Sequence, residues 1–236
     1  MAEVLLKTEE LTKSFGGLVA IQELSMEVEA GEIHAVIGPN GAGKTTLIAQ
    51  LSGSLKPDSG RILFKHQDIT HVPEYRRSAL GLARSFQITS VLKNFSALDN
   101  VALAVQAHAG HSFRFWSKAR KAQELREPAL EILEKIGLTD RMDMPASSLS
   151  HGEQRQLELA MALATRPKLL LLDEPMAGMG VEESQKMVEL LQELKGTHTL
   201  VLIEYDMDAV FALADRITVM VYGAVSYTHL RAHETR

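Results

Sequence analysis

The sequence predicts an α/β fold, in which strands and helices alternate along the chain around a parallel sheet. The prediction rests on KLLLLDEP at 168–175 and HTLVLIEYD at 198–206, two continuous apolar runs that lead into acidic residues. Runs of this kind are typical of strands that a parallel sheet buries on both faces. Between them, residues 182–196 place apolar side chains at the spacing of an amphipathic helix.

The remaining segments extend this pattern in chain order. Short apolar or alternating runs between turn residues predict strands at 4–11, 24–32, 32–38 and 59–69. The segment KTTLIAQLSG at 44–53 predicts a helix that follows a glycine-rich loop and ends near Gly53. From about 88 to 138 the chain is rich in Ala, Leu, Glu, Lys and Arg at helical spacing. This middle region predicts a helical insertion into the α/β core.

The composition favours a globular protein of the cytoplasm. Of 236 residues, 45% are hydrophobic and 23% are charged, which suits one domain or two intimate subdomains. The chain has no cysteine, so disulfides and thiolate metal sites are excluded and a reducing compartment fits. We expect neither a membrane-spanning helix nor a signal peptide. The net charge of -5 argues against a nucleic-acid partner, because a phosphate backbone binds basic surfaces.

A glycine-rich stretch between a predicted strand and a predicted helix indicates a phosphate-binding loop. GPNGAGKTT matches the pattern G-x-x-x-x-G-K-[ST] completely. Its glycines allow backbone angles that point successive N–H groups into one concavity, and the helix adds its positive end. Lys44 is expected to bind the β- and γ-phosphates, and the Thr45 hydroxyl to bind Mg²⁺. The expected nucleotide-binding residues are Gly38, Pro39, Asn40, Gly41, Ala42, Gly43, Lys44, Thr45 and Thr46.

Two carboxylates near the end of LLLLDEP complete the prediction of a nucleoside triphosphatase. Asp173 is placed to hold Mg²⁺, directly or through water, and Glu174 to polarise the attacking water. A strand that simply ends in a solvated acidic turn is the alternative interpretation. The phosphate-binding loop in the same chain favours the functional interpretation, with phosphates and Mg²⁺ as ligands; ATP as the nucleotide is implied only by the family resemblance that follows.

A third motif, LSHGEQRQLELAMALA at 149–164, predicts a capped helix that faces an anion. Ser150 and Glu153 form an S-x-x-E capping box, and Gly152 lets a ligand approach the first turn. A helix so capped presents its positive end. A capping box alone is common, but here it directly precedes LLLLDEP. With these motifs the chain resembles the ATP-binding cassette (ABC) proteins, whose five signature positions are matched by Leu149, Ser150, His151, Gly152 and Glu153.

The resemblance covers residues 1 to about 224, which it implies form a single ABC ATPase domain. It implies a P-loop NTPase core with a RecA-like parallel sheet, an N-terminal antiparallel β subdomain and an inserted α-helical subdomain. The implied boundaries are about 1–87 and 160–224 for the core with its β subdomain, and about 88–159 for the helical subdomain. It also implies a dimer, in which the signature segment of one subunit lies across the γ-phosphate bound by the other.

Two further residues have roles only through this resemblance. Phe15, in KSFGG, matches the aromatic residue that stacks on adenine, although it also suits a core or edge phenylalanine. Gln87, in RSFQ, matches the glutamine that reaches Mg²⁺ and couples the core to the helical insertion. By itself, Gln87 would be an ordinary surface glutamine.

Longer stretches resemble the ATPase subunits of branched-chain amino acid importers and their urea- or amide-importing relatives: SFGGLVAI, RSFQ, LSHGEQRQLELA, DEPMAGM and DMDAVFALADRITVMVYG. This implies a cytoplasmic subunit, peripheral on the inner face of the cell membrane, that hydrolyses ATP to energise import. The implied partners are integral-membrane permease subunits, a second ABC ATPase subunit (a second copy or a paralogue) and, indirectly, a periplasmic or extracellular solute-binding protein. A lipopolysaccharide-export ATPase is an alternative. A soluble ABC protein of DNA repair or translation fits less well, because the chain holds a single cassette without long heptads.

The chain departs from the ABC pattern at two positions near the expected site. Gly180 stands where many relatives carry an aspartate that contacts the other site. Tyr205 stands where the family has a switch histidine that contacts the γ-phosphate and helps to hold the attacking water. A tyrosine can still donate a hydrogen bond. We therefore expect slower hydrolysis with binding retained; the alternative is an ATP-dependent clamp with little turnover.

The last residues depart from the pattern in a different way. VSYTHLRAHETR at 225–236 resembles the translated read-through of a transposase sequencing adapter, whereas relatives continue with a strand, a glycine-proline turn and a helix. We expect this tail to be an artefact that adds nothing to folding. His229 and His233 have the i, i+4 spacing of metal ligands, but no third ligand is suggested and we reject that interpretation.

Overall fold

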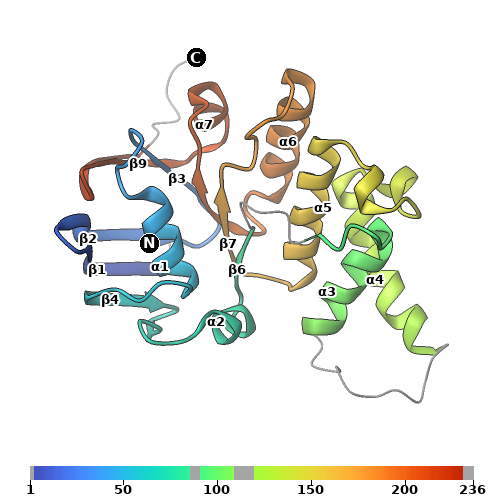
Figure 1. The fold of residues 1–236 in the computed structure, drawn as a ribbon, viewed down its shortest axis with the longest axis horizontal. Coiled ribbons are helices and arrows are strands. Elements are labelled where there is room, and N and C mark those ends of the chain that lie inside the picture. Colours follow the sequence, from blue (N-terminus) through green and yellow to red (C-terminus); the bar gives the residue numbers. More distant parts are fainter. Residues whose placement is uncertain (1–2, 86–90, 109–119, 231–236) are drawn as a thin grey trace. The chain divides into compact units, whose positions relative to one another are not determined.

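The computed structural model describes residues 3–85, 91–108 and 120–230 (Figure 1). The chain divides into two compact units. The core unit comprises Met1–Arg84, Lys168–Glu174 and Leu191–Arg236, and the helical unit comprises Ser85–Pro167 and Pro175–Leu190. The signature segment and the loop after Glu174 both belong to the helical unit. The subdomain boundaries implied by the resemblance stay a prediction.

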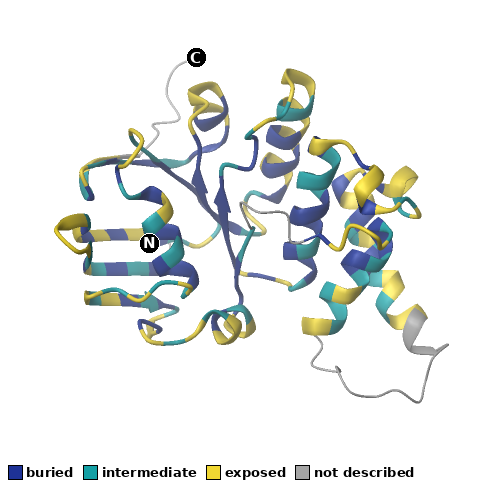
Figure 2. Cartoon of the chain, in the orientation of Figure 1, coloured by how far each residue is buried: buried dark blue, intermediate teal, exposed yellow. Residues whose placement is uncertain are grey.

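A mainly parallel sheet forms the centre of the core unit, as the apolar runs predict. Its strand order is β10-β9-β3-β8-β7-β6, in which only β10 is antiparallel to its neighbour. The strands are β3 (Ile33–Ile37), β6 (Leu82–Arg84), β7 (Leu169–Asp173), β8 (Thr199–Ile203), β9 (Arg216–Val221) and β10 (Ala224–Leu230). Every residue of β7 and β8 is buried (Figure 2), because helices and the second sheet cover the apolar faces.

A second, antiparallel sheet in the same unit has the strand order β2-β1-β4-β5. It consists of β1 (Val4–Phe15), β2 (Leu18–Glu29), β4 (Ser59–Phe64) and β5 (Gln67–Asp68). One face contributes Leu6, Ile21 and Phe64 to a hydrophobic cluster that also holds residues of the first helix. The α/β class with an antiparallel subdomain, predicted from the sequence, is confirmed.

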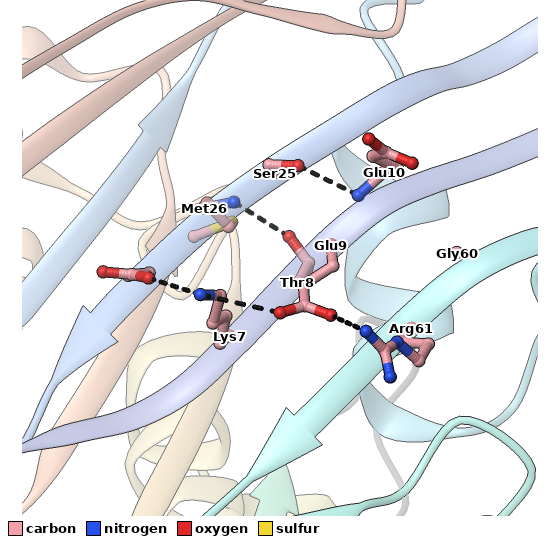
Figure 3. Close-up of a pocket in the computed structure, with 9 residues that line it drawn as sticks. Lys7, Thr8, Glu9, Glu10, Ser25, Met26, Gly60 and Arg61 are labelled. Atoms are coloured by element: carbon pink, nitrogen blue, oxygen red, sulfur yellow. Dashed lines mark hydrogen bonds and ion pairs between the residues drawn. The ribbon is translucent and has the colours of Figure 1, made fainter. Parts of the chain in front are cut away.

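The other face of this antiparallel sheet carries a row of alternating charges (Figure 3). Lys7 lies 3.0 Å from Glu27 on one neighbouring strand and 3.6 Å from Glu9, and Glu9 lies 2.7 Å from Arg61 on the other. The hydrogen bond with Glu27 raises the pKa of Lys7. Pairs so exposed to water contribute little to stability, but their alternation favours one strand register over its neighbours.

Seven α-helices and two short 3-10 helices, η1 (Thr139–Arg141) and η2 (Ala146–Ser148), complete the part of the chain that the structure describes. The core unit contains α1 (Lys44–Ser52), α2 (Glu74–Leu80) and α7 (Met207–Leu213) in addition to the two sheets. The helical unit contains α3 (Ala97–His108), α4 (Arg120–Ile136) and α5 (His151–Ala164), which pack against one another, and the start of α6 (Val181–Leu194). None of the helices in these described ranges is long and apolar enough to cross a membrane.

The C-terminal tail corrects one expectation. Residues 224–230 form β10, which pairs along the whole of β9. The side chain of Val225 packs against the core cluster, and the Thr228 hydroxyl lies 3.1 Å from that of Thr218. The expectation that the tail adds nothing to folding is therefore wrong for these residues, because the extended segment pairs with backbone N–H and C=O groups on the free edge of β9. The origin of the tail in an adapter stays a prediction, and His233 lies outside the described residues.

A buried arginine closes the C-terminal end of α1, the helix that follows the phosphate-binding loop. The guanidinium of Arg77, on α2, donates to the carbonyl oxygens of Gln50 (2.8 Å) and Leu51 (2.7 Å). It also donates to Thr70 O (3.0 Å) and Val72 O (2.8 Å). Burial lowers its pKa to about 10. A cation at this end of a helix also complements the helix dipole.

We predict that Arg77→Met lowers the free energy of unfolding by about 3 kcal/mol, because it leaves buried carbonyl groups without donors. Urea denaturation followed by circular dichroism measures the change. Arg76→Met is the matched control, since Arg76 is the exposed neighbour on the same helix. Equal losses for the two variants would show that the contacts of Arg77 do not hold α1.

Candidate active site

The carboxyl ends of three neighbouring strands meet at one level of the parallel sheet. Ile203, the last residue of β8, is paired with Val36 of β3 on one side and with Asp173 of β7 on the other. The phosphate-binding loop (residues 38–46), Glu174 and Tyr205 follow these strands closely. They are therefore gathered at the edge where open α/β sheets bind their ligands.

The phosphate-binding loop needs glycine at two places for steric reasons. Gly38 has φ +155°, and a Cβ there would overlap the carbonyl oxygen of Met220 on β9. Gly43 has φ +97°, and a Cβ there would overlap the carbonyl oxygen of Ala20 on β2. The loop backbone is thus held against both sheets of the core unit. Gly43 is also the N-cap of α1 and offers no capping side chain, so the first turn can face an anion.

Lys44 is only 4% exposed and is held by its own loop. Its Nζ donates to the carbonyl oxygens of Gly38 (2.7 Å) and Pro39 (3.0 Å). The same ammonium lies 4.3 Å from the centre of the Tyr205 ring, within the range of a cation–π contact. A bound phosphate would replace the carbonyl groups as the partner of Lys44. The hydroxyl-bearing side chains that follow differ in exposure: Thr45 is exposed and Thr46 is partly buried.

Asp173 is buried at the end of β7 and is only partly satisfied. Its Oδ2 accepts a hydrogen bond from Arg84 at 3.3 Å, and its Oδ1 has no hydrogen-bond partner among the described residues. Burial raises the pKa of the carboxyl, against the opposing charges of Arg84 and Lys44. An unpartnered buried carboxylate oxygen at the end of β7 suits Mg²⁺, which prefers oxygen ligands. Sequence reasoning missed Arg84; its place in RSFQ, three residues before Gln87, was the available signal.

Glu174 has the backbone strain that is common at functional positions. Its φ is +51°, in the left-handed region, and its N–H donates to Ile203 O at 2.9 Å. That conformation costs a residue other than glycine roughly 1–2 kcal/mol and persists only when its surroundings enforce it. The turn directs the chain out of the sheet immediately after Asp173, where the sequence predicts a catalytic carboxylate.

Comparison with known proteins decides the family. The model of the ABC transporter family matches residues 21–177. The chain belongs to this family. It is 36% identical over 232 residues to the high-affinity branched-chain amino acid transport ATP-binding protein LivG of Escherichia coli, covering 94% of this chain and 90% of that protein. It is 38% identical over 224 residues to a probable LivG of Archaeoglobus fulgidus, covering 94% and 87%.

Solved structures agree with this ABC assignment. The ADP conformation of MJ1267, an ATP-binding cassette of an ABC transporter, has a TM-score of 0.85 and 31% identity and covers 97% of this chain and 91% of that one. The cbiO1 protein of Clostridium perfringens has a TM-score of 0.83 and 28% identity and covers 97% and 89%. The predicted P-loop ATPase fold is therefore confirmed, and this ABC cassette is a nucleotide-binding ATPase.

The two residues assigned by resemblance alone differ in what the structure says of them. Phe15 ends β1 and is 49% exposed, so it is not a core phenylalanine. Lys13 Nζ lies 5.6 Å from the centre of its ring. An exposed aromatic face suits the proposed stacking on adenine. Gln87 lies outside the described residues, and its role stays a prediction.

In the helical unit of the cassette, the signature segment forms the predicted capping box. Ser150 is the N-cap of α5: its Oγ accepts from Glu153 N at 3.1 Å, and Glu153 Oε2 accepts from Ser150 N at 2.8 Å. Burial opposes ionisation of Glu153, but Arg141, at 2.9 Å, and Ser150 leave its pKa below the ordinary value. A Cβ at Gly152 would overlap the carboxyl group of Glu183. The sequence did not indicate this last contact.

We predict that Lys44→Ala weakens ATP binding by more than about tenfold, because a hydrogen bond to a charged group contributes about 1.5–3 kcal/mol. Titration calorimetry at physiological magnesium measures the affinity. Lys56→Ala, at an exposed position of the same unit, is the control. An affinity for Lys44→Ala within about twofold of the parent would refute the assignment of the loop.

Proposed function

We propose that this ABC cassette hydrolyses ATP to energise an importer of branched-chain amino acids or similar small polar solutes. The observation that carries the ATPase part is that Lys44 follows β3 while Asp173 and Glu174 follow β7, and both strands pair with β8 at the same level. The solute class is supported by relatives named as branched-chain amino acid transport ATP-binding proteins, which match more than nine tenths of this chain. No observation on the described residues favours the lipopolysaccharide-export alternative.

Some residues of the chain bind the nucleotide, and others take part in its hydrolysis. Lys44 exchanges the carbonyl groups of its loop for the β- and γ-phosphates, while the Phe15 ring carries the adenine. Thr45 and Asp173 would hold Mg²⁺, with Gln87 as a further ligand. When bound, this ion neutralises the charge that develops on the phosphates. Glu174 polarises the attacking water.

The partners follow from the same proposal. Ser150, Gly152 and Glu153 face the γ-phosphate bound by a second ABC subunit, so that two ATP molecules are enclosed by a dimer. Integral-membrane permeases bind the helical unit at the inner face of the membrane, and a solute-binding protein acts through them. Purifying the tagged chain from its own membranes tests this arrangement. Two apolar permease subunits should co-purify, and their absence would contradict the importer assignment.

We predict that Glu174→Gln keeps ATP binding but stops turnover, so that an ATP-bound dimer accumulates. Gln is nearly isosteric but cannot serve as a base. Phosphate release and size-exclusion chromatography with ATP measure the two effects. Glu193→Gln, an exposed acid on α6, is the control for the loss of one charge. A monomer with undiminished phosphate release would remove Glu174 from the mechanism.

We predict that Tyr205→His raises ATP turnover in the assembled transporter, while Tyr205→Phe lowers it. Phe keeps the ring face that contacts Lys44, so it tests the hydroxyl alone and should leave ATP affinity unchanged. One positioned donor at such a site contributes about 2–4 kcal/mol, and each ~1.4 kcal/mol is tenfold in rate. The hydroxyl of Tyr205 is expected to supply part of the rate enhancement that the histidine of the family provides.

Single-turnover hydrolysis by the three variants, with the permeases present, distinguishes the possibilities. If Phe matches Tyr and His brings no gain, the tyrosine serves only to cover Lys44. A parent enzyme that binds ATP and closes but shows no hydrolysis would favour the ATP-dependent clamp.

A further inference from the structure

A carboxylate of the chain itself lies at the N-terminal turn of α5. Ser150 Oγ donates to Glu183 Oε1 at 3.1 Å. The same carboxyl group lies so close to Gly152 that a Cβ there would be 2.5 Å from its Cδ and 2.7 Å from its Oε1. All these residues belong to the helical unit. Glu183 therefore occupies the space that the missing side chain of Gly152 leaves open.

The groups that meet Glu183 are those that a phosphate would need. They are a serine hydroxyl, the open face of a glycine and the positive end of a 14-residue helix. The negative charge of the other acid at this turn, Glu153, is balanced by the ion pair with Arg141 and by the capping box. Among the described residues, Glu183 has no cationic partner. One of its carboxylate oxygens is bound by the same turn that would bind the anion.

A simpler role for Glu183 is to cap α6, where it lies in the first turn. Its Oε2 accepts from Gly180 N at 3.3 Å, which resembles one half of a capping box. This contact uses one carboxylate oxygen and leaves the other for Ser150. Gln supports a capping box as well as Glu does, but it carries no charge. The change from Glu to Gln therefore separates the two roles.

We propose that Glu183 is an autoinhibitory acid, which fills the signature turn in the monomer and must leave before that turn accepts the γ-phosphate held by a second copy of the chain. This inference rests on the proposed function, since it needs ATP at the phosphate-binding loop of that copy. A phosphate that enters the turn meets a like charge in a partly desolvated interface, which opposes association. Because Glu183 is only partly buried, rotation of its side chain toward solvent would remove the obstacle.

The test uses Glu174→Gln as the parent, so that hydrolysis does not disperse the dimer. Glu183→Gln is compared in this background with Glu182→Gln, which removes an exposed acid from the same helix turn. The two variants change the net charge and the dipole of α6 alike, but only Glu183 contacts α5. ATP affinity of the dilute monomer is measured by fluorescent nucleotide titration, and dimer formation by sedimentation velocity over a range of ATP concentrations.

We expect Glu183→Gln to lower the dimer dissociation constant by about tenfold or more, because one like-charge contact is removed at each of the two ATP molecules that the dimer encloses. Glu182→Gln should leave the constant unchanged. Neither change should alter the ATP affinity of the monomer or its urea denaturation midpoint. Without ATP, both variants should stay monomeric.

Three results would overturn the proposal: equal dimerisation of the two variants, weaker dimerisation of Glu183→Gln, or no dimer from either although both bind ATP. The first would leave Glu183 as a cap of α6. The second would make it a group that positions Ser150 for the dimer. If instead the parent does not bind ATP at all, the proposed function itself fails, and the nucleotide titration shows this separately.

Discussion

The register of three parallel strands is the constraint on which the active site depends. Because Ile203 is hydrogen-bonded in register with both Val36 and Asp173, the segments that follow β3, β7 and β8 leave the sheet at one level. A slip of one residue in either pairing would turn the alternating side chains of a strand to the opposite face. Because β7 and β8 are buried on both faces, the polar residues that follow them cannot shift into the strands without burying polar groups in the core. The proposed catalytic groups therefore owe their positions to the apolar residues of these buried strands.

The charges in the core unit are incompletely paired in a way that suits their ligand. Lys44 and Asp173 are both almost fully buried, yet the lysine bonds only to neutral carbonyl groups, and one aspartate oxygen has no hydrogen-bond partner in the described ranges. Buried charges without full partners are costly. A magnesium-bound triphosphate would supply anionic oxygens to the lysine and a cation to the aspartate. The arrangement is therefore stabilised most by the ligand that it is proposed to bind.

Both proposed phosphate sites are covered by groups of the chain itself. At the phosphate-binding loop, the carbonyl groups of Gly38 and Pro39 and the ring of Tyr205 meet the lysine. At the signature turn, the carboxylate of Glu183 meets the helix end. Such contacts limit the cost of leaving a binding site without its ligand. They differ in sign: the loop covers a cation with neutral groups, whereas the signature turn is covered by an anion that would compete with phosphate.

The sequence by itself determined the features that depend on neighbours along the chain. The glycines of the loop, the capping box of Ser150 and Glu153, and the buried strands that end at Asp173 and Ile203 follow from short-range sterics and hydrophobic pattern. Only the tertiary structure decided the contacts between distant residues. The hydrogen bond between Arg84 and Asp173 joins residues 89 apart in sequence, and that between Ser150 and Glu183 joins residues 33 apart. The C-terminal residues pair with β9 as β10. Such contacts depend on register, on burial and on which edge remains free, and no local pattern of residues specifies these.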